Sequence, residues 1–82
     1  MSASRKNIVG IAVRERRRAL GIDQDELAAR LGRVGWITSE NVLSKIEAGF
    51  RRVSDEEVVY LAQALRVTIS DLFPSSAKIS RR

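Results

Sequence analysis

The feature that most constrains the fold of this chain is a pair of short helical patterns between Asp23 and Glu47. The first pattern opens with Asp23 and Glu26, which have the spacing of a capping box at a helix N-terminus. Apolar residues at helical spacing follow on one face, at Leu27, Ala28 and Leu31. Gly32 comes directly after them and is expected to end this helix, because glycine is favoured just beyond helix C-termini.

The second pattern predicts a helix over residues 39–48. Ser39 is a favoured N-cap residue. The side expected to be buried carries Val42, Leu43 and Ile46. The opposite face is polar and carries Glu40, Asn41, Ser44 and Lys45. These side chain types suit the major groove of DNA, where Asn can bond adenine, Lys can donate to guanine and Glu can accept from the amino group of cytosine.

One helix is expected before this pair, from Ile8 to Leu20. Its apolar side is supplied by Ile8, Val9, Ala12, Val13 and Leu20. The charged run at 14–18 is expected to form mainly a solvated face. Arg17 is the exception, because it lies four positions after Val13 and therefore near the inner edge of the helix.

Two helices are expected after the pair. Ser54 and Glu57 form a second capping-box pattern, and the apolar residues that follow predict a helix to about Leu65. If the backbone of Arg66 is left-handed, arginine there costs about 1 kcal/mol relative to glycine. Thr68 is expected to cap a short last helix.

Length and composition bound the class of protein. A chain of 82 residues allows one domain with one modest core. The net charge of +5 is typical of domains that meet nucleic acid, although such a charge also serves solubility. The chain has no Cys and no His, and no catalytic set replaces them. We therefore expect no enzyme activity, no cofactor and no metal site. The apolar run at 8–13 is too short to span a membrane, which predicts a soluble cytoplasmic protein.

Several ordered stretches resemble the phage repressor and Cro-like helix-turn-helix family, also called the xenobiotic response element family. They are GIDQDELA at 21–28, LSKIEAG at 43–49, LAQAL at 61–65 and DLF at 71–73. No single stretch is specific, but the ordered set at these spacings is. The resemblance implies an all-α, compact five-helix repressor-like domain with a helix-turn-helix at 8–74. A flexible N-terminal arm at 1–7 and a flexible basic tail at 75–82 are expected on either side.

The resemblance implies a transcriptional repressor that binds specific double-stranded DNA through the helix at 39–48, the recognition helix. The family's base-contacting positions fall on Glu40, Asn41, Ser44 and Lys45. Phosphate contacts are expected from Gln24, Ser39, Arg51 and Arg52, since the two arginines follow the recognition helix in a loop that suits phosphate oxygens. In the family pattern Arg17 pairs with Glu47, which would tie the first helix to the recognition helix.

The resemblance also implies a homodimer on a pseudo-palindromic site, with recognition helices roughly 34 Å apart. Ile69 and Phe73 are the expected interface residues, because the short last helix is more apolar than closing the core requires. The loop from Val34 to Ile37 is the alternative surface. No membrane and no small-molecule effector are expected as partners.

The connector between the two helices departs from the family's commonest form, because the chain from Gly32 to Glu47 is longer. It is similar to a variant with a lengthened turn that contains Gly35 and Trp36. Trp36 either stacks on a sugar or base, or covers the core beneath the turn, which is the commoner fate of a lone tryptophan.

A second function is compatible with the same fold: a protein-interaction module, such as the antitoxin of a toxin–antitoxin pair. The tail after Phe73 is short and polar, which favours DNA binding over this alternative. A steep loss of affinity for random duplex DNA as salt rises would distinguish the DNA binder.

Overall fold

The structure is a computed structural model that describes residues 5–74. Within that range the chain forms α1 (Gly10–Ala19), α2 (Gln24–Val34), α3 (Glu40–Ala48), α4 (Asp55–Leu65) and a 3-10 helix, η2 (Ile69–Leu72). The predicted all-α class is confirmed for this part of the chain. The expected tail at 75–82 and the first residues of the expected arm lie outside the described residues.

The starts of three α-helices follow the capping residues that the sequence predicts. The side chains of Asp23, Ser39 and Ser54 accept hydrogen bonds from the backbone N–H groups of Glu26, Val42 and Glu57, respectively. At α4 the capping box is complete, because the Glu57 side chain also accepts from the backbone N–H of Ser54. Each contact satisfies a backbone donor that the first turn of a helix would otherwise leave free.

The predicted end of α2 at Gly32 is wrong. The helix continues to Val34, and the residue that ends it is Gly35, whose φ of 120° lies where residues with a Cβ are rarely found. Gly32 stays within the helix, where glycine is tolerated at a cost of about 1 kcal/mol relative to alanine. The extra residues of the connector therefore lengthen α2 as well as the turn.

The predicted fifth helix is a single 3-10 turn, so the expected count of five α-helices is corrected to four plus η2 within residues 5–74. Its predicted cap is present: Thr68 and Asp71 form a reciprocal capping box. The turn cannot extend because Phe73 has an extended backbone, as the proline that follows it favours. Its backbone hydrogen bonds, from Asp71 to the Thr68 carbonyl and from Phe73 to the Ser70 carbonyl, have the i→i+3 spacing of a 3-10 helix.

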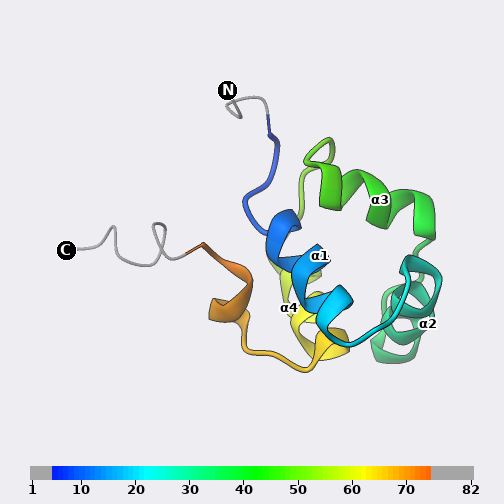
Figure 1. The fold of residues 1–82 in the computed structure, drawn as a ribbon. Coiled ribbons are helices and arrows are strands. Elements are labelled where there is room, and N and C mark those ends of the chain that lie inside the picture. Colours follow the sequence, from blue (N-terminus) through cyan, green and yellow to red (C-terminus); the bar gives the residue numbers. More distant parts are fainter. Residues whose placement is uncertain (1–4, 75–82) are drawn as a thin grey trace.

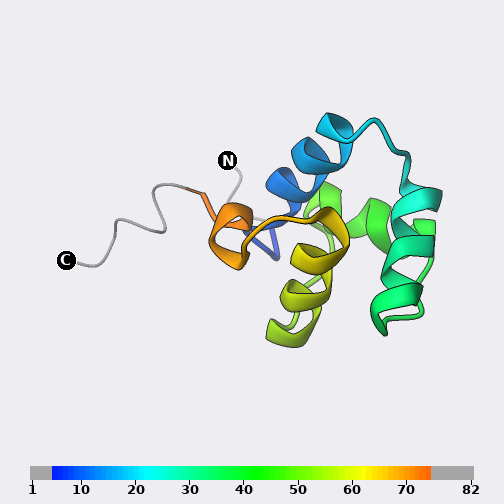
Figure 2. The ribbon, with the colours of Figure 1, turned by 90° about the horizontal axis from the view of Figure 1, so that it is seen from below.

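One core joins these elements. Its fully buried members come from every helix and include Val13, Leu27, Leu31, Leu43, Ile46, Leu61, Leu65 and Leu72. Helix α3 lies along one edge of the domain with α1 and α2 beneath it, and η2 lies at the end of the domain away from α2 (Figures 1 and 2). The outer face of α3 is therefore not covered by another described element.

Helix α1 buries less of its apolar side than the sequence pattern predicts. Val9 and Val13 are buried, but Ile8 and Leu20 are more than 40% exposed. The helix is also shorter than expected, beginning at Gly10 and ending at Ala19. Leu20 is the C-cap residue of α1; its backbone is still helical, yet its side chain at the end of the helix remains 43% exposed.

Candidate nucleic-acid interface

The recognition helix predicted at 39–48 is α3, and its two faces differ sharply. Leu43 and Ile46 are completely buried. The side chains on the outer face are all exposed: Glu40, Asn41, Ser44 and Lys45. Ser39, the N-cap residue of α3, is also exposed. A polar, uncovered helix face of this size fits the width of the major groove.

The inner end of α3 is fixed by the buried carboxylate of Glu47. Arg17 of α1 donates from Nε and Nη2 to its two oxygens, at 2.8 and 2.9 Å. Gln24 of α2 donates to the same carboxylate at 3.1 Å, and Arg14 lies 3.6 Å from it. One side chain at the end of α3 thus binds both of the preceding helices.

Burial disfavours the charged form of Glu47, yet the hydrogen bonds from Arg17 and Gln24 together outweigh it and lower the pKa of the carboxyl. The pKa of Arg17 is raised, chiefly by its hydrogen bond to Glu47 and against the effect of burial. Both groups are therefore charged at neutral pH. The side chain of Glu47 is 1% exposed and that of Arg17 is 11% exposed, so solvent screens this pair weakly.

A second group of carboxylates lies at the N-termini of α2 and α3. The hydrogen bond and negative charge of Asp25 raise the pKa of Glu40, and the charge of Asp23 adds to the effect. A shallow hollow between the two helices is lined by Asp25, Ser39, Glu40 and Asn41, among others. This part of the outer face therefore repels anions more strongly than the rest of it does.

The expected phosphate contacts differ in their freedom to reach DNA. Gln24 is half-buried and uses one amide N–H on Glu47, which leaves its second N–H unassigned. Ser39 uses its oxygen as the α3 N-cap, and its hydroxyl proton can still be donated. Arg52 is exposed.

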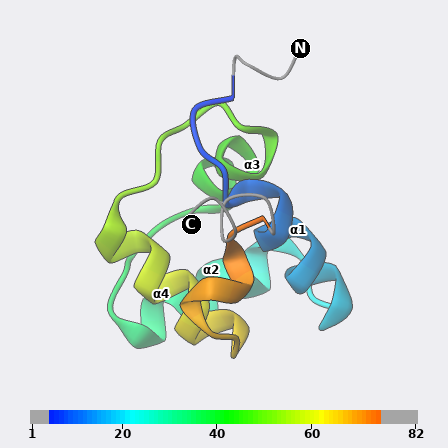
Figure 3. The same cartoon turned by 90° about the vertical axis from the view of Figure 1, so that its left-hand side faces the viewer.

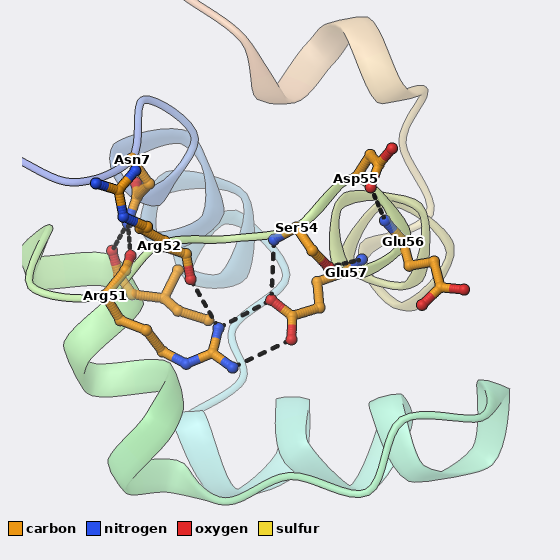
Figure 4. Close-up of polar contacts among 8 residues, drawn as sticks. Asn7, Arg51, Arg52, Ser54, Asp55, Glu56 and Glu57 are labelled. Carbon is orange, nitrogen blue, oxygen red and sulfur yellow. Dashed lines mark hydrogen bonds and ion pairs between the residues drawn. The ribbon is translucent and has the colours of Figure 1, made fainter.

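Arg51 is engaged within the protein. Its Nη1 and Nη2 atoms donate to the two carboxylate oxygens of Glu57, at 2.9 and 3.1 Å (Figure 4). Its guanidinium carbon also lies 5.8 Å from the ring centroid of Trp36. Arg51 and Arg52, which the sequence predicts as equivalent phosphate contacts, therefore have different surroundings.

Asn7 is a site residue that the sequence analysis missed. It is buried, and its amide nitrogen donates to the carbonyl oxygens of Ile46 and Arg51, at 3.0 and 2.8 Å. Its side-chain oxygen accepts from the N–H of Gly10 at 2.7 Å. Asn7 thus bonds the first residue of α1 and adds a second donor to the Ile46 carbonyl, which also accepts from the N–H of Gly49. Its position three residues before Gly10 is a capping signal that the sequence contains.

Residues 5 and 6 also follow the end of α3, where they run beside the loop after that helix (Figure 3). The N–H of Lys6 donates to the carbonyl of Gly49, and Arg5 donates to the carbonyl of Glu47. Gly49 has a left-handed backbone, and a side chain there would collide with Arg5. Residues 5–7 of the expected arm are accordingly bonded to the recognition helix and the loop after it.

An apolar surface surrounds η2. Ile69 is 46% exposed and Phe73 is half-buried. Both line a groove whose other apolar walls come from Ile8, Val9, Val53, Val58 and Val59. The alternative surface at 34–37 includes the most exposed large apolar residue of the described chain, Ile37, at 86%.

Two further findings concern residues 5–74. No helix there is long and apolar enough to cross a membrane. No group of acidic side chains in this range is arranged to hold a metal ion.

Comparison with known proteins gives matches over most of the chain. Residues 13–72 match a family model described as helix-turn-helix. A Rhodospirillum rubrum protein described as an uncharacterized transcriptional regulator in the ATPase CF(0) region is 40% identical over 65 residues, which are 79% of this chain and 56% of the relative. This chain thus spans little more than half the length of that relative.

A solved structure has the same fold. The crystal structure of the restriction-modification controller protein C.AhdI from Aeromonas hydrophila superposes with a TM-score of 0.70 at 32% sequence identity. The match covers 79% of this chain and 87% of the controller protein. At this identity the likeness extends beyond the arrangement of helices to the sequence.

Proposed function

The chain belongs to the phage repressor and Cro-like helix-turn-helix family, and from this premise we propose that it is a transcription regulator, a repressor, that binds specific sites in double-stranded DNA. The observation that carries the proposal is the exposed polar face of α3, held by the buried contacts of Glu47. A helix that is both uncovered and rigidly oriented can present its side chains to base edges in a fixed register. A domain bound in this way blocks the groove to other proteins, which is the basis of repression.

We assign base contacts to Glu40, Asn41, Ser44 and Lys45. Asn41 and Lys45 are four residues apart and therefore project from one side of the helix. Asn41 can form a bidentate pair with adenine, and Lys45 can donate to guanine. Glu40 can accept from cytosine, although its neighbour Asp25 makes this end of the helix strongly negative.

We assign backbone contacts to Gln24, Ser39 and Arg52. Gln24 and Ser39 lie at the N-termini of α2 and α3, where free backbone N–H groups and the helix dipole favour a phosphate. Arg52 lies in the loop after α3. These contacts would bracket the base-contacting residues and fix the protein's register on the duplex.

We propose further that two copies bind one pseudo-palindromic site, with Ile69 and Phe73 in the dimer interface. One domain of this size makes few base contacts, so one half-site gives limited specificity. The groove beside η2 offers apolar area for pairing. The helix η2 itself lies at the end of the domain away from α2 (Figure 1). The surface from Val34 to Ile37 is the alternative interface.

Selection of bound duplexes from a random library tests this function directly. The proposal predicts one enriched sequence with approximate two-fold symmetry and half-sites about 10 base pairs apart. Sedimentation of the protein with that duplex should give two copies per DNA. Failure to enrich any sequence would contradict specific binding, and one copy per duplex on an asymmetric site would contradict the dimer.

A further inference from the structure

The turn before α3 and the loop after it meet in one side-chain cluster. Trp36 comes from the turn, Arg51 from the loop, and Glu57 and Tyr60 from α4. We propose that Arg51 and Trp36 are positioning residues, which fasten both segments that flank the recognition helix to α4 and so set the orientation of α3 on DNA. This inference rests on the proposed function and gives Arg51 a role other than phosphate binding.

The contact between Arg51 and Glu57 has the two-pronged geometry of a strong ion pair. Both terminal nitrogens of Arg51 face the two oxygens of Glu57, and Nη1 also donates to the carbonyl of Arg52 at 2.9 Å. The side chains are only 34% and 20% exposed, respectively. The hydrogen bond from Arg51 is the main cause that lowers the pKa of Glu57, so this carboxylate is charged at neutral pH.

Glu57 is itself a rigid partner. Its Oε1 atom accepts from the backbone N–H of Ser54 at 3.1 Å as part of the α4 capping box. The close-up shows Arg51 extended toward this carboxylate, while Glu56 is turned away from it (Figure 4). The guanidinium of Arg51 is therefore anchored to the first turn of a core helix.

The same guanidinium lies over Trp36, which anchors the lengthened turn. Its carbon is 5.8 Å from the ring centroid, within the range of a cation–π contact. The ring of Trp36 also packs against Tyr60, with centroids 6.3 Å apart and planes tilted by 36°. The N–H of Trp36 donates to the carbonyl of Leu31 at 2.9 Å, which fixes its backbone.

The backbone of Arg51 is held from the opposite side. Its carbonyl accepts from Asn7, which also donates to the carbonyl of Ile46 in the last turn of α3. The C-terminal end of α3 is thus connected to α1 and α4. Its N-terminal end is connected to α4 through Trp36. Freeing Arg51 would loosen both connections at once.

The competing role for Arg51 is a phosphate ligand that Glu57 holds while DNA is absent. The two roles predict opposite effects of Glu57→Gln. If Arg51 binds phosphate, the substitution releases it, and affinity rises for every duplex. If Arg51 positions α3, the substitution loosens the helix flanks, and affinity for the selected duplex falls relative to random duplex.

Glu56→Gln is the matched control, because it removes the same charge from the neighbouring residue of α4 without touching Arg51. We expect Glu56→Gln to leave the ratio of affinities for selected and random duplex unchanged. We expect Glu57→Gln to lower that ratio about fivefold or more, the smallest loss that one displaced base contact produces. Equal tightening on both duplexes would overturn the proposal.

Trp36 provides a readout that needs no DNA, because it is the only tryptophan in the chain. Arg51→Met should make Trp36 more accessible to acrylamide quenching of its fluorescence and should leave the salt slope of random-duplex binding unchanged. The control Arg52→Met should leave the quenching of Trp36 as in the wild type. It should lower the salt slope of random-duplex binding by about one.

Wild-type quenching in Arg51→Met, together with a salt slope lowered by about one, would show that Arg51 binds phosphate and would refute the positioning role. A wild-type protein that binds no duplex would refute the proposed function instead. In that case the quenching comparison still decides whether Arg51 holds the turn that contains Trp36.

Discussion

Replacement of Arg17 by methionine should remove the main ion-pair partner of Glu47, the most deeply buried carboxylate of the described chain. Met keeps most of the apolar length of Arg17 but donates to neither oxygen of Glu47. The carboxylate would keep Gln24 and the more distant Arg14, at 3.1 and 3.6 Å. Removing one partner of a buried pair costs about 3–5 kcal/mol, and these remaining contacts favour the lower end of that range.

A loss of about 3 kcal/mol is a large part of the roughly 4–12 kcal/mol expected for a domain of this length. It corresponds to a fall in melting temperature of roughly 12–24 °C. Glu47→Gln should cost less, about 2 kcal/mol, since an amide of the same shape keeps some hydrogen bonds. The double variant should therefore lose clearly less than the sum of the single variants.

The pH dependence of Arg17→Met gives an independent check. In the wild type the pKa of Glu47 is lowered by folding, so its contribution is complete above the ordinary glutamate pKa and is lost as the pH falls through the folded value. Without Arg17, burial dominates and raises the pKa of the carboxyl. The variant should then gain stability as the pH falls from 7 to 5. Strictly additive losses in urea denaturation, or a wild-type pH profile, would refute this account of the pair.

Three other changes test separate parts of the structure. Arg66 has a left-handed backbone with φ of 61°, so Arg66→Gly should raise stability by about 1 kcal/mol in thermal melts, whereas Arg66→Ala should give no gain. Asp25 raises the pKa of Glu40, and nearby phosphates should raise it further, so affinity for random duplex should increase as the pH falls from neutral through the raised pKa of Glu40. Glu40→Gln should bind more tightly at pH 7 and lose most of this dependence. Ile69→Ser should shift the dimer on the selected duplex toward single copies in sedimentation, and an unchanged stoichiometry would favour the surface at 34–37.

The sequence predicts the parts of the fold that local chemistry determines. Asp23, Ser39 and Ser54 start helices because their side chains satisfy free N–H groups within the same turn. The sequence predicts the backbone conformation of Arg66 only conditionally, and the structure shows it left-handed at the C-cap of α4. The contact of Arg17 with Glu47 joins residues far apart in the chain, and only the family pattern indicated it.

The features that the sequence did not predict depend on packing between distant segments. Gly32 and Gly35 both fit a helix end, and the choice of Gly35 comes with the packing of the following turn on Tyr60. Asn7 carries a capping signal, but its bonds to Ile46 and Arg51 exist only once α1 meets the end of α3. No pattern in the sequence distinguishes Arg51 from Arg52, because the difference is made by the position of α4.

The exposed face of α3 should distinguish one DNA sequence from another. The most direct measurement is the affinity of Asn41→Ala and Lys45→Ala for the selected duplex and for random duplex at the same salt concentration. Each substitution should cost about 1–3 kcal/mol on the selected duplex and change little on random duplex. Equal losses on both duplexes would show that these side chains only hold phosphate, and no loss on either would show that α3 does not face DNA.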